Sequence, residues 1–171
     1  MTIDEAAMQR LLDREAIRDA LTRYSRGIDR HDVECIVSAF HPDAVDTHGA
    51  WEGGPEALAE WGNREHARHW LAHQHFLGNT SFDFDGDTCH TETYVLDVQR
   101  RKDERGNDVL GGRYIDRFER RDGEWRIVRR VLLLDWTGEL AADPSRAQDL
   151  LERYDTGRWD RDDLSYRRPL D

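Results

Sequence analysis

The sequence predicts an α+β domain, in which N-terminal helices cover one face of a curved, antiparallel or mixed sheet. Up to about residue 70, apolar residues recur with the helical period. From residue 73 onward, segments rich in Thr, Tyr and Val alternate with turn signals such as Asp122-Gly123. Helices followed by hairpins are typical of a sheet with helices packed on one face. A strongly curved sheet of this kind would enclose a conical cavity under the helices, a usual ligand site.

The N-terminal part predicts three helices. The first begins near Thr2 and Glu5, which have the spacing of a capping box. Its apolar stripe comprises Ile17, Ala20, Leu21, Tyr24 and Ile28. A short second helix begins at His31-Asp32 and stops at His41-Pro42-Asp43. The residues expected to face inward from it are Val33, Ile36, Val37 and Phe40. The third helix begins at Gly53-Gly54-Pro55 and runs through Trp61 to His66, since proline suits a first helical turn.

The remaining segments predict one short strand, four long strands and a last helix. The short strand spans Val45–His48, and the long ones span 73–84, 88–101, 110–121 and 125–136. The first long strand is interrupted near Gly78-Asn79. The expected turns are Asp85-Gly86-Asp87, Arg105-Gly106-Asn107-Asp108 and Asp122-Gly123. We therefore expect one domain over residues 1–140, and a C-terminal helix (145–154) with a polar tail over 141–171.

Composition excludes several classes of protein. Among 171 residues, acids outnumber bases 36 to 25, which disfavours nucleic acid as a partner because phosphates must be neutralised by clustered Lys and Arg. Six Trp, five Tyr and five Phe argue against disorder despite the net charge of −11. The sequence contains no apolar run long enough for a membrane span. The first residues do not resemble an export signal, and Cys35 and Cys89 are expected to be reduced thiols, so we expect a cytoplasmic protein.

Three stretches together resemble one superfamily. They are R-Y-S-R-G-I-D-R-H-D (23–32) with F-H-P-D-A (40–44), H-Q-H-F-L-G-N (73–79) with D-G-D-T (85–88), and G-R-Y-I-D-R-F-E-R-R-D-G-E-W-R-I (112–127). Over residues 8–136 the chain resembles the nuclear transport factor 2-like superfamily, in its SnoaL-like branch. That branch includes scytalone dehydratase, bile-acid 7α-dehydratase, hexachlorocyclohexane dehydrochlorinase and small polyketide cyclases. The resemblance implies a cystatin-like α+β barrel, a fold that hosts many different functions.

The resemblance implies a catalytic dyad of Asp29 and His75. A neutral imidazole can take a proton from carbon, and an Asp on its far nitrogen fixes the tautomer. The alternative is structural: Asp29 would cap the helix that begins at Asp32 or pair with Arg26, and His75 would be an ordinary sheet histidine. His73 lies two residues away on the same strand face, so either histidine could be the dyad member.

Three further residues are candidates for catalysis by the same resemblance. Tyr24 would hydrogen-bond a substrate oxygen. On an ideal helix, however, it lies about 140° from Asp29, so both reach one pocket only if the helix loosens near Gly27. Asp97, a carboxyl in an apolar strand, would donate a proton to a leaving hydroxyl. Arg130 would assist departure of the leaving group. The alternatives are core packing for Tyr24, an outward ion pair of Asp97 with Arg113 or Arg117, and a surface position for Arg130.

The residues expected to contact substrate are His73, Asn79, Trp51 and Phe76. The alternative for Asn79 is a bulge or turn, and the alternative for Trp51 and Phe76 is core packing. We expect no metal site. His73 and His75 would need a third ligand, such as His69 or His90, and no metal-binding spacing is present.

The resemblance implies a cofactor-free lyase or isomerase, dehydratase-like, acting on a small hydrophobic cyclic molecule such as a polyketide or steroid. Two alternatives stay open. One is a non-catalytic ligand-binding or assembly domain of the same fold. The other is an epoxide-hydrolase-like enzyme that holds water between Asp97, Arg130 and Asp116. A homo-oligomer, dimer or trimer, is expected, and the tail around Trp159 and Tyr166 would reach a partner or close the cavity.

Overall fold

The computed structural model describes residues 4–169, which form a six-stranded mixed sheet and its covering helices. The helices are α1 (Glu5–Arg30), α2 (Val33–Ser38), α3 (Pro55–His69) and α4 (Pro144–Arg153), with a 3₁₀ turn at Leu164–Tyr166. The strands are β1 (Phe40–His48), β2 (Trp51–Gly53), β3 (Trp70–Asp85), β4 (Thr88–Arg101), β5 (Gly106–Arg121) and β6 (Glu124–Ala141).

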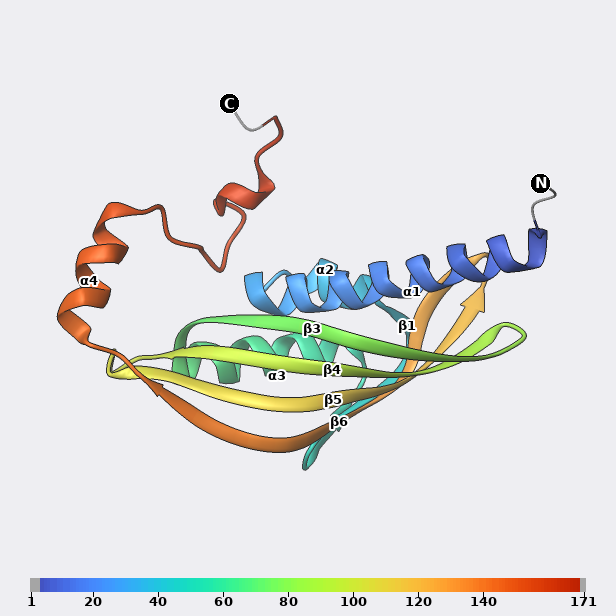
Figure 1. Cartoon of the computed structure of the whole chain (residues 1–171), viewed down its shortest axis with the longest axis horizontal. Helices are drawn as coiled ribbons and strands as arrows, with labels where there is room; N and C mark the ends of the chain where they lie inside the picture. Colours follow the sequence, from blue (N-terminus) through green and yellow to red (C-terminus); the bar gives the residue numbers. More distant parts are fainter. Residues whose placement is uncertain (1–3, 170–171) are drawn as a thin grey trace.

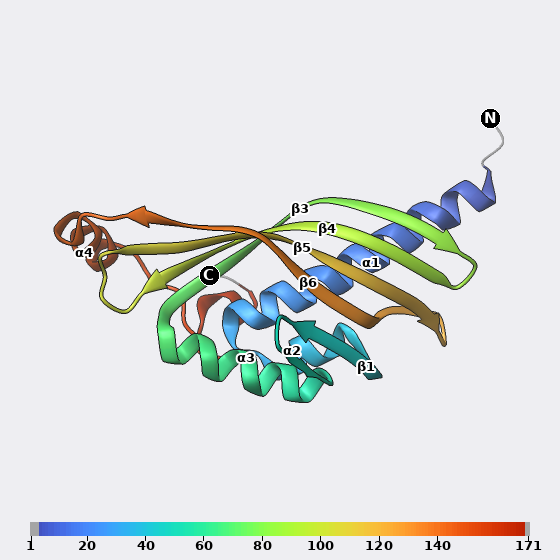
Figure 2. The same cartoon turned by 90° about the horizontal axis from the view of Figure 1, so that it is seen from below.

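The strand order is β2-β1-β6-β5-β4-β3, and only the β1–β6 pair is parallel. The sheet curves and stays open, with β2 and β3 at its edges (Figure 1). Turned by 90°, the molecule shows α1, α2 and α3 together on one side of the sheet, with α4 beyond its end (Figure 2). The predicted α+β class is confirmed. None of the described helices is long and apolar enough to cross a membrane.

The first helix is longer and more regular than expected. Asp4 caps it by accepting from the backbone N–H groups of Ala6 and Ala7, while Thr2 lies outside the described residues. Every member of the predicted apolar stripe is buried. The helix does not loosen at Gly27, because α1 continues to Arg30, so the condition for Tyr24 and Asp29 to reach one pocket is not met. A Cβ at Gly27 would lie 2.6 Å from the backbone nitrogen of Ile36, so glycine there lets α2 pack closely on α1.

The second helix and the strand after it differ from the prediction. Asp32 caps α2 as expected, but Val33 is 41% exposed, because a helix of six residues buries only the face around Ile36. The strand then begins at Phe40 rather than Val45. Phe40 already pairs with Ile127 of β6, and a register irregularity follows before Val45. The short strand β2 was not predicted.

The four long strands follow the predicted hairpins. The interruption in β3 is confirmed as a register shift between Leu77 and Thr80. Asp122 and Gly123 both take positive φ, as a tight hairpin turn requires. The predicted turn over 105–108 is wrong. The chain turns before Gly106 and places Glu104 at positive φ, which leaves residues 106–108 free to pair with β6.

The C-terminal tail packs on its own chain. After α4 it returns to the end of α1, where the ring of Trp159 stacks on His31 at 4.0 Å. The Tyr166 hydroxyl donates to Asp32 Oδ2 at 2.7 Å, beside the first turn of α2. Asp163 is buried there and accepts from the backbone N–H groups of Arg158 and Ser165. These contacts hold the tail against the ends of α1 and α2 of its own chain.

Candidate active site

Asp29 and His75 meet where the end of α1 packs against β3. Asp29 Oδ1 accepts from His75 Nδ1 at 2.7 Å, and its two oxygens also accept from the backbone N–H of His75 at 3.2 and 3.1 Å. The structural alternative for Asp29 is wrong, because Asp32 caps α2 by itself. With Nδ1 bonded to the carboxylate, the assigned tautomer leaves Nε2 of His75 as the free basic nitrogen.

Asp97 lies on β4, directly opposite His75 of β3, and faces the same side of the sheet. It is the register partner of His75, and Asp97 Oδ2 lies 3.8 Å from His75 Nε2. Gln99 donates its side-chain amide to the same oxygen at 2.6 Å. The expected alternative, an outward ion pair with Arg113 or Arg117, is wrong. Arg113 pairs with Glu92 and Asp135, and Arg117 with Glu119.

Burial and the two carboxylates set the ionisation of this group. Burial alone would lower the pKa of His75, but the charges of Asp97 and Asp29 outweigh it and raise that pKa above its usual value. Burial also raises the pKa of Asp97, although His75 opposes the shift. An imidazole buried between two carboxyl groups can exchange a proton with one while the other holds its orientation.

Two oxygens beside His75 have no hydrogen-bond partner among residues 4–169, namely Asp97 Oδ1 and Gln99 Oε1. Gln99 also borders a pocket of about 470 Å³, whose wall includes Trp70, Val109 and Leu110. A second pocket of about 770 Å³ lies between β3 and the tail, with Asp29, His73 and Trp159 in its wall. Gln99 was missed in the sequence, although it stands two residues after Asp97 on the same strand face.

His73 is not the histidine that Asp29 binds. Its side chain is buried with 2% exposure, and Nε2 donates to the backbone carbonyl of Ile28 at 2.9 Å. Burial, followed by the neighbouring histidines, lowers its pKa to about 2. The bond to Ile28 fixes the end of α1 against β3, and this helps to place Asp29 beside His75.

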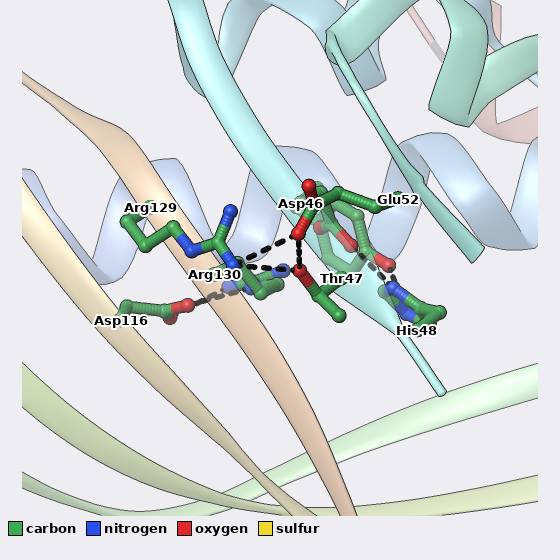
Figure 3. A network of polar contacts seen from close by, with 8 residues as sticks. Asp46, Thr47, His48, Glu52, Asp116, Arg129 and Arg130 are labelled. Carbon is green, nitrogen blue, oxygen red and sulfur yellow. Dashed lines mark hydrogen bonds and ion pairs between the residues drawn. The ribbon is translucent and has the colours of Figure 1, made fainter. Parts of the chain in front are cut away.

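Arg130 and Tyr24 lie in a second buried cluster, together with Tyr114 and Asp116. Arg130 Nε and Nη2 donate to the two oxygens of Asp116 at 2.7 Å each, and neither side chain is exposed. The guanidinium lies 4.2 Å from the Tyr24 ring centre and 4.1 Å from that of Tyr114. Figure 3 shows Asp46 and His48 of β1 facing this pair, and His48 Nδ1 bonds to Asp46.

This placement changes three predictions. Arg130 is not at the surface, and the hydrogen bonds of its guanidinium go to Asp116 rather than into the Asp29–His75 group. Tyr24 is buried, with its hydroxyl 3.5 Å from His48 Nε2, because the regular helix turns it away from Asp29. The epoxide-hydrolase-like set is not assembled, since Asp97 contacts His75 and Gln99 while Asp116 contacts Arg130. For Asp46 and His48 the sequence predicted only a short strand and no place in a buried cluster.

The other predicted contact residues lie apart from His75. Trp51 stacks on Trp61 at 4.8 Å and packs against the core. Phe76 is 53% exposed, because strand alternation turns it to the face opposite His75, so its expected place in the cavity is wrong. Asn79 is exposed at the register shift inside β3, which agrees with the bulge alternative and not with a turn.

Comparison with known proteins gives a consistent result. Residues 9–131 match the SnoaL-like domain family. The uncharacterized protein Rv2910c of Mycobacterium tuberculosis is 29% identical over 123 residues, which are 70% of this chain and 83% of that protein. Hexachlorocyclohexane dehydrochlorinase LinA type 3 of Novosphingobium barchaimii LL02 superposes with a TM-score of 0.73 at 24% identity, over 80% of this chain and 96% of that chain. A provisionally assigned scytalone dehydratase of Novosphingobium aromaticivorans DSM 12444 gives 0.70 at 22% identity, over 80% and 93%. At these identities the superpositions establish the fold.

Proposed function

The chain belongs to the SnoaL-like domain family, and on this premise we propose that it is a cofactor-free, dehydratase-like lyase or isomerase. The observation that carries the proposal is the 2.7 Å hydrogen bond between Asp29 and His75, at the buried edge of the concave face. Two structural neighbours are named as a dehydratase and a dehydrochlorinase, and both names describe an elimination. Their names support the class of reaction, and the residues of this chain supply the mechanism.

In the proposed reaction, His75 removes a proton from a carbon next to a carbonyl group. Nε2 of His75 is the base, and Asp29 holds Nδ1 and stabilises the imidazolium. Asp97, whose pKa is raised by burial, gives its proton to the leaving hydroxyl. The C–H electron pair forms the new C=C bond, the C–O bond breaks, and water leaves. Transfer of the proton from His75 to Asp97, 3.8 Å away, restores the starting state.

We propose that the substrate is a small hydrophobic cyclic molecule with a hydroxyl group. Its hydroxyl would bond to Asp97 Oδ1 and Gln99 Oε1, the two unpartnered oxygens in the described chain near His75. The ring would occupy the pocket of about 470 Å³ that Gln99 borders, where Val109 and Leu110 supply apolar surface. A substrate that only shifts a double bond would use His75 and leave the hydroxyl contact unused.

The test uses cyclic β-hydroxy ketones and compares His75→Gln with His90→Gln. Loss of water is followed by the ultraviolet absorption of the conjugated product and by mass spectrometry. We expect turnover to fall about 10²–10⁴-fold in His75→Gln, the usual contribution of a general base. His90, exposed on β4, is the matched control and should leave turnover unchanged. Undiminished turnover in His75→Gln, with circular dichroism like that of the parent chain, would remove His75 from the mechanism.

The binding-domain alternative makes the opposite prediction for the same panel. It expects Asp29 and His75 beyond hydrogen-bond reach, whereas they are 2.7 Å apart. Binding of panel members by calorimetry, without loss of water or exchange of the α-proton in D₂O, would favour this alternative over the lyase.

We also propose that the sheet face opposite the helices pairs with a second copy of this chain. Exposed apolar side chains gather there from neighbouring strands, namely Phe76, Tyr94, Leu96 and Leu133. Light scattering at micromolar concentration should give a dimer or trimer, and Phe76→Glu should shift it toward the monomer. A monomeric parent chain would overturn this assignment.

A further inference from the structure

Three histidines from separate elements meet beside the proposed catalytic group. His31 ends α1, His66 lies near the end of α3, and His73 lies on β3. One ring nitrogen of each lies within 4.8 Å of a ring nitrogen of the other two. The ring centres are 4.1 Å apart for His66 and His73, 5.5 Å for His31 and His73, and 6.2 Å for His31 and His66.

Each of these rings has a buried nitrogen without a hydrogen-bond partner in residues 4–169. The three atoms are His31 Nε2, His66 Nδ1 and His73 Nδ1. A buried polar atom without a partner costs free energy, and three in one place need an explanation. Burial lowers the pKa values of the three rings to about 4, 3 and 2, respectively, so at neutral pH each presents an uncharged imidazole.

We propose that His31, His66 and His73 bind a divalent first-row transition metal ion of the zinc type. Three imidazole nitrogens with a fourth position left for water is an established zinc geometry. Imidazole also suits Co²⁺, Ni²⁺ and Cu²⁺, whereas Mg²⁺ and Ca²⁺ require oxygen ligands. Ligand nitrogens at about 2.0–2.1 Å from zinc lie roughly 3.3 Å from one another, so the side chains need only modest rotation.

The surroundings of the histidines match those of metal ligands. His73 donates its other ring nitrogen to the carbonyl of Ile28 at 2.9 Å, and a bond of this kind usually orients a metal-binding imidazole. Trp159 from the tail stacks on His31, and Trp70 lies 5.8 Å from His66, so aromatic rings border the site. His31 takes positive φ at the end of α1, where its backbone N–H bonds to the helix, and its ring is thereby directed to the other two.

The sequence predicted no metal site because no metal-binding spacing is present around His73 and His75. The third ligands considered there, His69 and His90, are not in this group. The ligands proposed here are 31, 66 and 73, and their spacing matches no local metal motif because the fold brings them together. The inference does not depend on the proposed reaction, in which His75 and Asp97 carry the protons. A bound ion would tie together the end of α1, the end of α3 and the edge strand β3.

The test titrates the purified full chain, treated with a chelator, with Zn²⁺ by calorimetry and with Co²⁺ by visible absorption. The parent chain should bind one equivalent and give the absorption of tetrahedral Co²⁺. His66→Gln should weaken binding about 100-fold or more, because even outer partners of metal ligands contribute 10–100-fold. His69→Gln, three residues further on α3 and exposed, is the matched control and should bind like the parent chain.

A second variant guards against a folding defect. His31→Asn keeps a residue that tolerates positive φ and removes one ligand, so it should fold normally and bind as weakly as His66→Gln. The site would be overturned if the parent chain showed no saturable metal binding. It would also be overturned if both variants bound the metal with the affinity of the parent chain. So would binding lost in His75→Gln and retained in His66→Gln, because Asp29, His73 and His75 form a second group with ligand atoms within 4.8 Å.

Discussion

Two groups of buried charges lie under the same helices, and they are built in different ways. In one, His75 stands between Asp29 and Asp97, and the outer oxygen of Asp97 has no partner among the described residues. In the other, both oxygens of Asp116 accept from Arg130, and the guanidinium lies between two tyrosine rings. Both are buried and both hold pKa values away from the ordinary range.

The two groups differ in which of their buried polar atoms have no hydrogen-bond partner. Both oxygens of Asp116 accept from Arg130, and the atom of this pair left without a partner among the described residues is a donor, Arg130 Nη1. We expect this pair to contribute to stability and to the shape of the core. Among the described residues, Asp97 Oδ1 and Gln99 Oε1 have no partner, and Gln99 also borders a pocket, so these acceptors can bond to a ligand. A buried charge therefore does not by itself indicate catalysis. Mutation of the Arg130–Asp116 group should therefore lower stability, whereas mutation of the Asp29–His75–Asp97 group should lower turnover.

The largest expected effect is on stability, in Arg130→Met. Removing the guanidinium leaves the Asp116 carboxylate buried without a partner, which should lower the free energy of unfolding by about 3–5 kcal/mol. Urea denaturation measures it. Arg129→Met is the neighbouring control, since Arg129 is half-exposed and bonds to Thr47 and Glu52, and it should change stability by less than about 1 kcal/mol.

A double variant separates the charge from the packing. Arg130→Met with Asp116→Leu removes both charges and should recover most of the lost stability, because the penalty comes from the unpaired carboxylate. Parent-like stability of Arg130→Met alone would mean that the pair does not hold the core.

The next effect is on turnover, in Asp29→Asn, and it rests on the proposed function. The amide cannot hold His75 in the same tautomer or stabilise the imidazolium, so kcat should fall about 100-fold, equivalent to about 2.7 kcal/mol. Stability should change by less than about 1 kcal/mol, since an acceptor oxygen remains for the backbone of His75. Asp19→Asn, on the exposed face of α1, is the control. A loss of stability as large as that of Arg130→Met would erase the contrast between the two groups.

Asp97→Asn is expected to have a smaller effect on stability, and here the effect is a gain. Burial raises the pKa of Asp97 above the usual 3.8, so the unfolded chain loses this proton at lower pH than the folded chain. The stability contributed by the protonated group is therefore present at low pH and declines as pH rises above about 4. Asn avoids the decline, and at pH 7 the variant should be about 1 kcal/mol more stable and much less active.

Thermal unfolding at pH 4 and pH 7 measures the Asp97→Asn difference, with the exposed Asp83→Asn as control. A stability gain that is the same at both pH values would show that the benefit is not linked to the carboxyl proton.

The fold could be predicted further than the site. Alternating residues in Thr88–Arg101 and the turn at Asp122-Gly123 determine their structure locally, and both appear as expected. Asp29 and His75 could be paired only through the resemblance, because nothing local links residues 46 positions apart. Strand alternation places the side chain of Phe76 on the face opposite His75. The prediction that Phe76 contacts substrate is wrong because it considered only the aromatic character of the residue.

Contacts between distant elements account for the rest. Arg130 and Asp116 are register partners across β5 and β6, so their pairing depends on a strand register that the sequence does not state. Tyr24 belongs to the predicted stripe, and the 3.6-residue period already separated it from Asp29. The meeting of His31, His66 and His73 requires the positions of α1, α3 and β3 together, and no single segment contains that information.

The smallest expected effect concerns the tail, which borders the Asp29 side of the molecule and does not contact Arg130. Tyr166→Phe removes one hydroxyl that donates to Asp32 at 2.7 Å, and should weaken tail docking by about 1 kcal/mol. The tail should open separately from the sheet, so its amides at Asp163, Tyr166 and Arg167 should exchange about fivefold faster. Amides of β5 and β6 around Asp116 and Arg130 should keep their rates, which makes them the internal reference for hydrogen-exchange mass spectrometry. Equal acceleration in both places would mean that the tail and the Arg130–Asp116 core open as one unit, and the two buried groups would then share a single stability.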